Sequence, residues 1–383
     1  MLSFAVLFFF CLALVERGFS TPLFRRDNTT TTAANGTTPL TDADIQSLDL
    51  VNIAAFAAAA YCVRAGSWDC GVACNQVPDT QIALTIGDDA ATPDAPPAYV
   101  AYSQSRNQII VGHEGTDPSQ ILSVENDVKF APTPLLTVLN VAGTPAGVEV
   151  HNGFQTAWVQ TSTTILDAVQ QILAQVPTAS VLVTGHSLGA AVSLLDAIFL
   201  KQQLPSNTSI QVMGFGRPRV GNQAFADWVD SMFGDKNGFV VSRDDPVPHV
   251  PLLDQGFVHA SGEIWIKDNT TTLSCAGQEN PNCSDSIGVL DAATGVSDHT
   301  GPYFGIDMGH APCVNLEITT TISGTPVTTT AAQITTPFST ALIIRTEAPT
   351  SKNSARSVGV TMGGVVAASA VALCTVAGTF FAL

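Results

Sequence analysis

One stretch of this chain, residues 180–191, restricts its possible folds more than any other. Residues 181–184 are apolar or β-branched, which is typical of a strand buried on both faces. From residue 190 to residue 200 apolar side chains follow almost without interruption, as in a helix that packs on most of its sides. Between them lies Gly185-His-Ser187-Leu-Gly189, whose glycines let a strand and a helix approach closely around a sharp turn. The stretch therefore predicts a strand, a tight turn at Ser187 and a helix.

A turn of this kind presents its serine at the carboxyl edge of a sheet, where the hydroxyl can act as a nucleophile. The backbone N–H of Leu188, at the start of the helix, then faces any anion that forms there. Gly-x-Ser-x-Gly alone also occurs in ordinary loops, but here the required strand and helix flank it. We predict that Ser187 is a catalytic nucleophile, which needs a base, an acid and a second oxyanion donor from elsewhere in the chain.

The N-terminal segment indicates export. Residues 1–20 are predicted to be a cleaved signal peptide, because residues 1–15 are nearly all apolar but too few to span a bilayer. Residues 21–40 are rich in Thr and Asn and are predicted to be processed or disordered. Five Asn-x-Ser/Thr sequons agree with secretion and are candidate glycosylation sites: Asn28, Asn35, Asn207, Asn269 and Asn282.

The cysteines also agree with an exported protein. Six lie between the signal peptide and the C-terminal tail: Cys62, Cys70, Cys74, Cys275, Cys283 and Cys313. An even number in an exported chain predicts three disulfides, although spacing alone allows fifteen pairings. The spacing does not match the paired Cys-x-x-Cys of zinc sites, so we predict no metal.

Residues 41–316 are predicted to form the catalytic domain. We expect strands at residues 98–103, 108–112, 180–184, 210–215 and 238–242. We expect helices at residues 41–60, 154–176, 190–200 and 223–232. Strands that alternate with helices predict an α/β fold, in which helices cover both faces of a mostly parallel sheet.

The charge of the chain excludes some partners. The formal net charge is −17, and the 15 Lys and Arg residues are spread thinly along the sequence. No basic patch is present, so we predict no nucleic-acid partner and no adsorption driven by anionic lipid headgroups.

A serine nucleophile needs an imidazole to take its proton and a carboxylate to hold that imidazole. Of the seven histidines, His299 lies after the serine in a loop with Gly and Pro, which is suited to present a side chain. Asp244 and Asp245 directly follow the predicted strand 238–242, and acids of this fold lie at such strand ends. Either aspartate could be the acid.

Six motifs follow one another in order between residues 53 and 313: His113-Glu-Gly-Thr116, His151-Asn-Gly-Phe154, Gly185-His-Ser-Leu-Gly189, Gly214-Phe-Gly-Arg-Pro-Arg-Val-Gly-Asn222, Asp245-Pro-Val-Pro and His299-Thr-Gly-Pro-Tyr-Phe304. With these motifs the chain resembles the fungal class 3 lipases, a branch of the α/β-hydrolases that includes triacylglycerol lipases and feruloyl esterases.

This resemblance implies an α/β-hydrolase fold and a triad of Ser187, Asp245 and His299. It also implies that Thr116 is the second oxyanion donor beside Leu188. The implied disulfides are Cys62–Cys313, Cys70–Cys74 and Cys275–Cys283. The chain departs from the family at one place, because many members have an aromatic residue and an arginine where this sequence has His113 and Glu114. The packing or charge beneath the oxyanion loop must therefore differ.

A short helical lid is expected after Thr116. Asp117-Pro-Ser-Gln120 is a good helix start, and an apolar face could follow from Ile121, Leu122, Val124 and Val128. The pattern also fits an ordinary amphipathic surface helix. The family resemblance implies a lid that opens at an oil–water interface.

We predict a secreted or cell-surface serine carboxylester hydrolase, in particular a lipase that acts on acylglycerols and needs no cofactor. The expected partner is therefore a lipid or other ester at an oil–water interface. A feruloyl or other small-ester esterase is the alternative, because polar residues share the lid segment: Ser123, Glu125, Asn126 and Asp127. A non-catalytic adhesion glycoprotein is a remote alternative, based on the Thr-rich region near the C-terminus.

That region, residues 317–352, is predicted to be a glycosylated stalk. Residues 353–383 contain small residues, a spacer of nine residues and an apolar tail of nineteen. These lengths predict a glycosylphosphatidylinositol (GPI) attachment signal with Asn353 as the modified residue, so that a lipid anchors the enzyme to the outer membrane face. A retained transmembrane helix is the alternative, since a helix of residues 358–383 would be about 39 Å long.

Overall fold

The computed structural model describes residues 36–63, 67–87, 96–116, 131–137, 143–288, 295–310 and 313. Several predicted features lie outside these residues. They are the signal peptide, Asn28, Asn35, the lid residues Ile121, Leu122, Val124 and Val128, the stalk and Asn353.

In the described part of the chain, nine strands form one sheet in the order β1-β11-β10-β9-β8-β7-β4-β3-β2. Its centre is parallel, from β4 through β7, β8 and β9 to β10. Both edges are antiparallel. The strands are β1 Thr37–Pro39, β2 Thr80–Ile86, β3 Ala98–Ser103, β4 Gln108–His113, β7 Ser180–His186, β8 Ile210–Phe215, β9 Asn237–Ser242, β10 Glu263–Ile266 and β11 Thr272–Cys275. Two further strands, β5 Thr133–Pro134 and β6 Glu149–Val150, pair separately.

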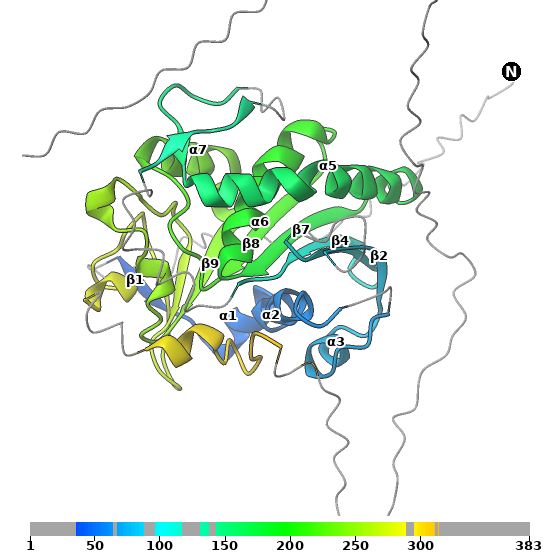
Figure 1. The fold of residues 1–383 in the computed structure, drawn as a ribbon. Helices are drawn as coiled ribbons and strands as arrows, with labels where there is room; N and C mark the ends of the chain where they lie inside the picture. Colours follow the sequence, from blue (N-terminus) through cyan, green and yellow to red (C-terminus); the bar gives the residue numbers. More distant parts are fainter. Residues whose placement is uncertain are drawn as a thin grey trace, which may run out of the picture. The chain divides into compact units, whose positions relative to one another are not determined.

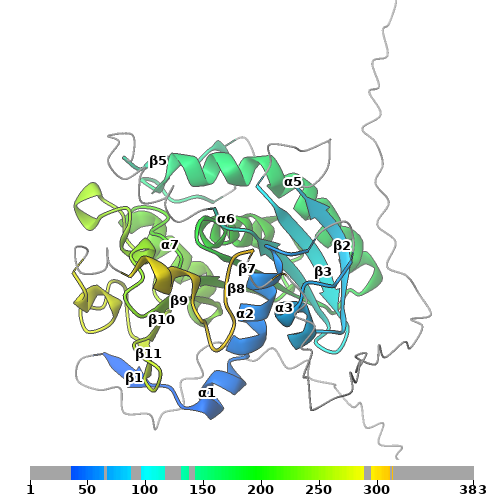
Figure 2. The same ribbon diagram turned by 60° about the horizontal axis from the view of Figure 1, so that its bottom comes forward.

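Helices cover both faces of this sheet. Figure 1 shows α5, α6 and α7 on one side and α1, α2 and α3 on the other, and Figure 2 shows α2 against the central strands. The helices are α1 Asp42–Ser47, α2 Leu50–Ala59, α3 Val72–Gln76, α5 Asn152–Gln175, α6 Leu188–Gln203 and α7 Gln223–Phe233. None of the helices in the described part of the chain is long and apolar enough to cross a membrane.

The central strands are apolar on both faces because each face has its own core. On β7, Val181 and Val183 pack with α5 and α6, whereas Leu182 between them packs with α2. Neighbouring β4 repeats this alternation with Ile109, Ile110 and Val111. This double burial explains why the strand before Ser187 reads as a continuous apolar run.

The structure differs from the sequence prediction mainly near the N-terminus. The single helix predicted for residues 41–60 is two helices, because Asp49 has φ of 61° and the chain bends there. Thr41 is the N-cap of the first helix, in a capping box with Asp44. The parallel part of the sheet is also confined to its centre.

Three disulfides tie the described segments together: Cys62–Cys313, Cys70–Cys74 and Cys275–Cys283. They are the pairs that the family resemblance implies. Cys62 follows α2, so its bond to Cys313 joins residues that are 251 positions apart. The other two bonds close short loops of 4 and 8 residues' separation beside α3 and β11.

Candidate active site

Ser187 occupies the strained turn that its flanking glycines predict. It lies between β7 and α6 with φ of 58° and ψ of −131°, which is rare for a residue with a side chain. A Cβ at Gly185 would lie 2.6 Å from the carbonyl oxygen of Gly189, and a Cβ at Gly189 would lie 2.5 Å from that of His113. Only glycine therefore allows strand and helix to meet this closely, and the backbone around Ser187 has little freedom to relax.

Asp245 and His299 form a buried pair beside this turn. The Nδ1 atom of His299 lies 2.9 Å from both carboxylate oxygens of Asp245, and both side chains are fully buried. The carboxylate is held by the backbone N–H of Val247, at 2.9 Å, and by the hydroxyl of Tyr303, at 3.3 Å. Burial raises the pKa of Tyr303 well above its ordinary value, so its hydroxyl keeps the proton that it donates.

Two buried atoms at this site have no hydrogen-bond partner among the described residues. They are the hydroxyl of Ser187 and Nε2 of His299. Because Nδ1 of His299 faces a carboxylate, it carries the ring proton, and Nε2 is the nitrogen with a free lone pair. A serine hydroxyl and a basic nitrogen are thus both unengaged, as a general-base step requires, and such bonds often tighten only when substrate binds.

The loop of residues 113–116, which is predicted to supply the second oxyanion donor, lies directly against the serine turn. A Cβ at Gly115 would lie 2.8 Å from Cβ of Ser187 and 2.6 Å from the carbonyl oxygen of His186. Thr116 follows at an exposed position, and Leu188 is the first residue of α6, whose N–H has no acceptor inside the helix. The structure therefore brings the two predicted donor residues to the same place as Ser187.

A series of hydrogen bonds, which was not predicted from the sequence, links the site to the residues that follow α2. The hydroxyl of Tyr61 lies 2.6 Å from Nδ1 of His186, and Nε2 of His186 lies 2.7 Å from the carbonyl oxygen of His299. Burial is the main cause that lowers the pKa of His186 well below its ordinary value, so this ring is neutral. Its Nε2–H donates to His299, and Tyr61 donates to Nδ1. The only signal in the sequence was the position of His186 beside Ser187.

Gly216 lies so close to Asp245 and His299 that a side chain at this position would collide with them. This gives a test of the site by mutation. Its φ is +54°, and a Cβ there would lie 2.8 Å from Cε1 of His299 and 2.9 Å from Oδ2 of Asp245. Gly234 has almost the same φ, +53°, but no described atom within 4 Å of such a Cβ. Gly216→Ala should therefore lower kcat at least about 10²-fold by displacing the imidazole. Gly234→Ala should keep the activity and lose only about 1–3 kcal/mol of stability. Equal activities in an ester-hydrolysis assay would contradict this.

A buried network of charges holds the segment that follows Asp245. Arg219 donates to the carbonyl oxygens of His249 and Pro251, and its guanidinium lies 2.8 Å from Glu279 and 3.2 Å from Asp285. Arg219 belongs to the motif that the resemblance quotes, but its role was not predicted from sequence. Since Arg219 fixes the chain at residues 249–251, it also limits movement of the carboxylate at Asp245.

Glu263, at the edge of this network, makes the stability depend on pH. Burial is the main cause that raises its pKa from 4.5 to about 7. Between these two values the folded chain holds a proton that the unfolded chain has released, so stability falls as pH rises from 4.5 to about 7. Glu263→Gln keeps an oxygen for the N–H of Ser284 but cannot ionise. The variant should be more stable than the parent above pH 7, by up to about 3 kcal/mol, and equal to it below pH 4.5.

Urea unfolding at pH 4.5 and pH 8 measures this difference, with the exposed Asp254→Asn as the control. A stability difference between Glu263→Gln and the parent that does not change with pH would contradict the prediction.

The remaining predicted residues are placed as follows. Asp244 is exposed, and its N–H donates to Asp298, so Asp245 is the aspartate that meets His299. His113 is buried with Nε2 at 2.7 Å from Asp196 on α6. One group of described residues, Glu263, Cys275 and Cys283, lies close enough together to hold a metal, but both sulfurs are bonded to each other.

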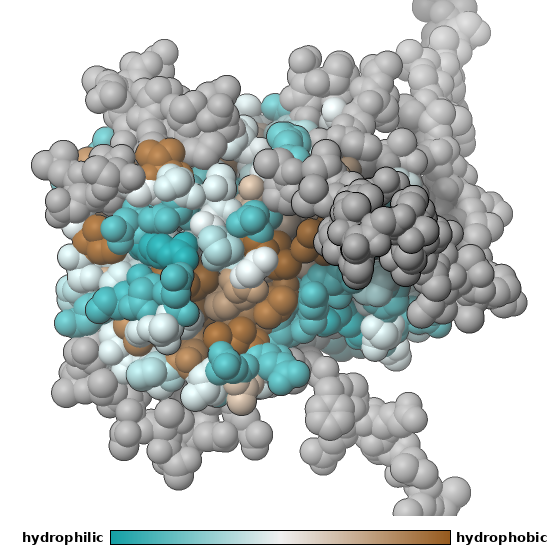
Figure 3. All heavy atoms as spheres, turned by 90° about the horizontal axis from the view of Figure 1, so that it is seen from below, coloured by the Kyte–Doolittle hydropathy of each residue, from teal (hydrophilic) through white to brown (hydrophobic). Residues whose placement is uncertain are grey.

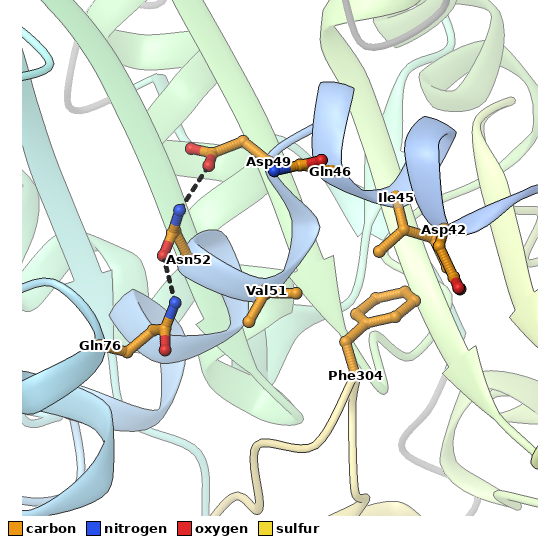
Figure 4. A pocket seen from close by; sticks show the side chains of 8 residues that line it. All are labelled: Asp42, Ile45, Gln46, Asp49, Val51, Asn52, Gln76 and Phe304. Carbon is orange, nitrogen blue, oxygen red and sulfur yellow. Dashed lines mark hydrogen bonds between the residues drawn. The ribbon is translucent and has the colours of Figure 1, made fainter.

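A hollow of about 450 Å³ lies between α1, α2 and Phe304, on the side of the sheet opposite α6. Figure 3 shows that apolar residues gather in the middle of this face, and Figure 4 shows the residues that line the hollow. Asn52 donates to Asp49, and Gln76 donates to Asn52. Since these polar side chains bind one another, and no triad residue lines the hollow, we assign it no catalytic role.

Comparisons with known proteins agree with this geometry. A family model described as lipase (class 3) matches residues 110–255. A secreted mono- and diacylglycerol lipase of Gibberella zeae is 35% identical over 215 residues, which cover 54% of this chain and 67% of that protein. The structure of lipase II from Rhizopus niveus is 33% identical, with a TM-score of 0.62, over 73% of this chain and 100% of that one. A solved triacylglycerol lipase with a serine protease triad as its catalytic centre is 32% identical, with a TM-score of 0.59, over 72% and 99%.

The fold and the site together define an α/β-hydrolase that cleaves carboxylic esters. The sequence identities of the matched proteins, and the share of each chain that the matches cover, then show which family within this class the chain belongs to. The chain belongs to the class 3 lipase family.

Proposed function

We propose that this protein is a secreted lipase that hydrolyses acylglycerols with Ser187, His299 and Asp245 as its triad. The observation that supports this assignment most is the buried imidazole of His299, held by Asp245 at 2.9 Å, with Nε2 unengaged. Secretion is supported by the disulfides and by relatives that are named secreted lipases.

In the proposed reaction, Ser187 attacks the ester carbonyl while Nε2 of His299 takes its proton. The same nitrogen then returns the proton to the departing alcohol, and water cleaves the acyl-enzyme. Asp245 holds the imidazole and stabilises its charged form. The backbone N–H groups of Thr116 and Leu188 hold the oxyanion, and each contributes about 3 kcal/mol to lowering the barrier.

The substrate class is tested with rates on emulsified mono-, di- and triacylglycerols and on feruloyl esters. The relatives' names include both lipases and mono- and diacylglycerol lipases, which supports acylglycerols over feruloyl esters. We expect hydrolysis of acylglycerols and at least about tenfold slower hydrolysis of methyl ferulate. A faster rate on methyl ferulate would support the feruloyl esterase alternative.

Access to the site supports a movable cover. Ser187 and His299 are both fully buried, so an ester can reach them only after another part of the chain moves. Residues 117–130 directly follow the oxyanion loop in the sequence, and the spacing of Ile121, Leu122, Val124 and Val128 predicts one apolar face, which a lid needs to bind lipid. A rise in specific activity when a soluble ester is replaced by its emulsion tests this proposal.

The regions around the catalytic domain are proposed on sequence grounds. They are a signal peptide (1–20), a processed or disordered segment, the catalytic domain (to residue 316), a stalk (317–352) and a GPI signal (353–383). The sequence prediction extended the processed or disordered segment to residue 40, which is wrong for its end, because Thr37–Pro39 form β1 and pair with β11 in the sheet. Three sequons lie at exposed positions, as glycosylation requires: Asn207, Asn269 and Asn282. Peptide mapping after deglycosylation tests these three sites.

The GPI anchor at Asn353 is tested on intact cells. A phosphatidylinositol-specific phospholipase should release the activity. If detergent alone releases it, and the released chain still contains peptides beyond Gly364, the anchor is a retained helix.

A further inference from the structure

The sequence departs from its family directly before the oxyanion loop, and the structure shows what the new residue contacts. Glu114 precedes Gly115 and Thr116, and its side chain is only 8% exposed. One of its carboxylate oxygens lies 3.0 Å from Nε2 of His310, which comes from the last described turn of the catalytic domain. This contact joins two segments that are far apart in the sequence.

The surroundings of His310 favour a charged ring. Its Nδ1 lies 3.0 Å from the carbonyl oxygen of Tyr61, while its Nε2 faces Glu114. Both partners are oxygens that only accept hydrogen bonds, so the ring makes both bonds only when both nitrogens carry protons. The side chain is 65% exposed, so it can exchange protons with water.

Two other titratable side chains at this contact, Tyr61 and His186, are neutral. Burial raises the pKa of Tyr61 well above its ordinary value, and its ring meets the His310 ring edge-on, with 5.4 Å between the ring centroids. His186, which contacts Tyr61, is neutral as described above. His310 and Glu114 are therefore the charged pair at this contact.

The turn that carries His310 is firmly attached. The N–H of Cys313 donates to the carbonyl oxygen of His310, and Cys313 is bonded to Cys62, the residue after Tyr61. His310 thus contacts Tyr61 directly and is linked to the same short segment through a disulfide. Because these bonds fix the position of His310, its contact with Glu114 can restrain the Glu114 side chain.

The contact with His310 restrains the side chain of Glu114, and the backbone of Glu114 in turn restrains Thr116, the proposed oxyanion donor. Its N–H donates to the carbonyl oxygen of Pro97, and its carbonyl oxygen lies against Gly189 in the first turn of α6. Only Gly115 separates it from Thr116. A shift at Glu114 therefore changes where the N–H of Thr116 points relative to that of Leu188.

We propose that Glu114 and His310 are positioning residues, which hold the oxyanion loop in place through an ion pair that is complete when His310 is protonated. The inference rests on the proposed function, because it needs Thr116 to be an oxyanion donor. Neither residue touches the reacting atoms. The alternative is a contact that stabilises the fold without affecting the reaction.

The test uses a double-mutant cycle on the full chain with p-nitrophenyl butyrate. Glu114→Gln and His310→Gln should each lower kcat about tenfold with KM changed less than about twofold, because the contact serves the transition state. The double variant should be no slower than either single variant. Asp307→Asn, at an exposed position in the same turn, is the control and should match the parent.

The pH profile separates positioning from stability. In the parent, kcat should decline at alkaline pH, where the ion pair with Glu114 is lost. His310→Lys keeps a positive charge at alkaline pH, so this variant should lack the decline, and His310→Gln should be low throughout. Circular dichroism and Tm at each pH establish that the compared variants are folded.

Single variants within twofold of the parent, or His310→Lys with the parent's pH profile, would overturn the proposal. So would effects of Glu114→Gln and His310→Gln that multiply in the double variant. A wild-type chain without esterase activity, and unlabelled at Ser187 by a fluorophosphonate, would instead refute the proposed function itself.

Discussion

Ser187→Ala is expected to lower kcat for ester hydrolysis about 10⁶-fold, to the residual rate supplied by binding and the oxyanion hole. The hydroxyl has no hydrogen-bond partner among the described residues, so its removal leaves no buried group unpaired. The variant should therefore keep the stability of the parent while losing its activity and its reaction with a fluorophosphonate.

A matched control exists on α5. Ser162 is also fully buried, and its hydroxyl likewise has no partner among the described residues, but it lies in the helical layer away from the triad. Ser162→Ala should retain full activity. An active Ser187→Ala variant would show that Ser187 is not the nucleophile. Loss of activity in Ser162→Ala without a change in Tm would show that the loss in Ser187→Ala is not specific to that position.

Asp245→Asn is expected to lower kcat about 10⁴-fold, whereas Asp244→Asn should change it less than about twofold. An amide at position 245 still accepts from the N–H of Val247, but its NH₂ group cannot accept from Nδ1 of His299. The imidazole is then driven to the tautomer whose Nε2 carries a proton, which cannot serve as a base.

The neighbouring aspartate is a close control. Asp244 is exposed and contacts Asp298 only through its backbone N–H, which Asn retains. Both rates are measured at saturating soluble ester, with circular dichroism on each variant. An inactive Asp244→Asn beside an active Asp245→Asn would show that the acid is misassigned.

The strands that sequence predicts well are those buried on both faces. The strand of residues 210–215 has the predicted bounds, and those before Ser187 and Asp245 extend the predicted ones by two residues and by one. An unbroken run of apolar residues identifies such a strand even when the strands beside it in the sheet are not known. The turn at Ser187 was predictable for a similar reason, because its glycines and its flanking strand and helix are all close together in the sequence.

The edges of the sheet could not be predicted in this way. Thr37 pairs with Cys275, far along the chain, so nothing local marks β1 as a strand. β2 is only partly buried and has an irregular register between Ile82 and Leu84, which breaks the alternation expected of a strand.

The supporting contacts of the site were missed because they are non-local and use ordinary residues. Tyr61 contacts His186, and Arg219 contacts Glu279, but each pair is too far apart in the sequence to belong to one short motif. The motif around His299 did contain Tyr303, but only the fold shows that its hydroxyl meets the carboxylate of Asp245. The departure at Glu114 was visible, whereas its partner His310 was not.

The bond between Cys62 and Cys313 has a consequence for how the enzyme is made. The proposed nucleophile lies in the middle of the chain, but the proposed base lies in the short helix of residues 296–300, and Cys313 joins the segment after that helix to Cys62, just beyond α2. A chain that has been synthesised only as far as α6 therefore has the serine turn without the proposed imidazole base. The proposed triad is complete only after the chain has been synthesised through residue 299, and the bond between Cys62 and Cys313 forms only in an oxidising compartment. In the proposed enzyme, the nucleophile is therefore made before the base that activates it.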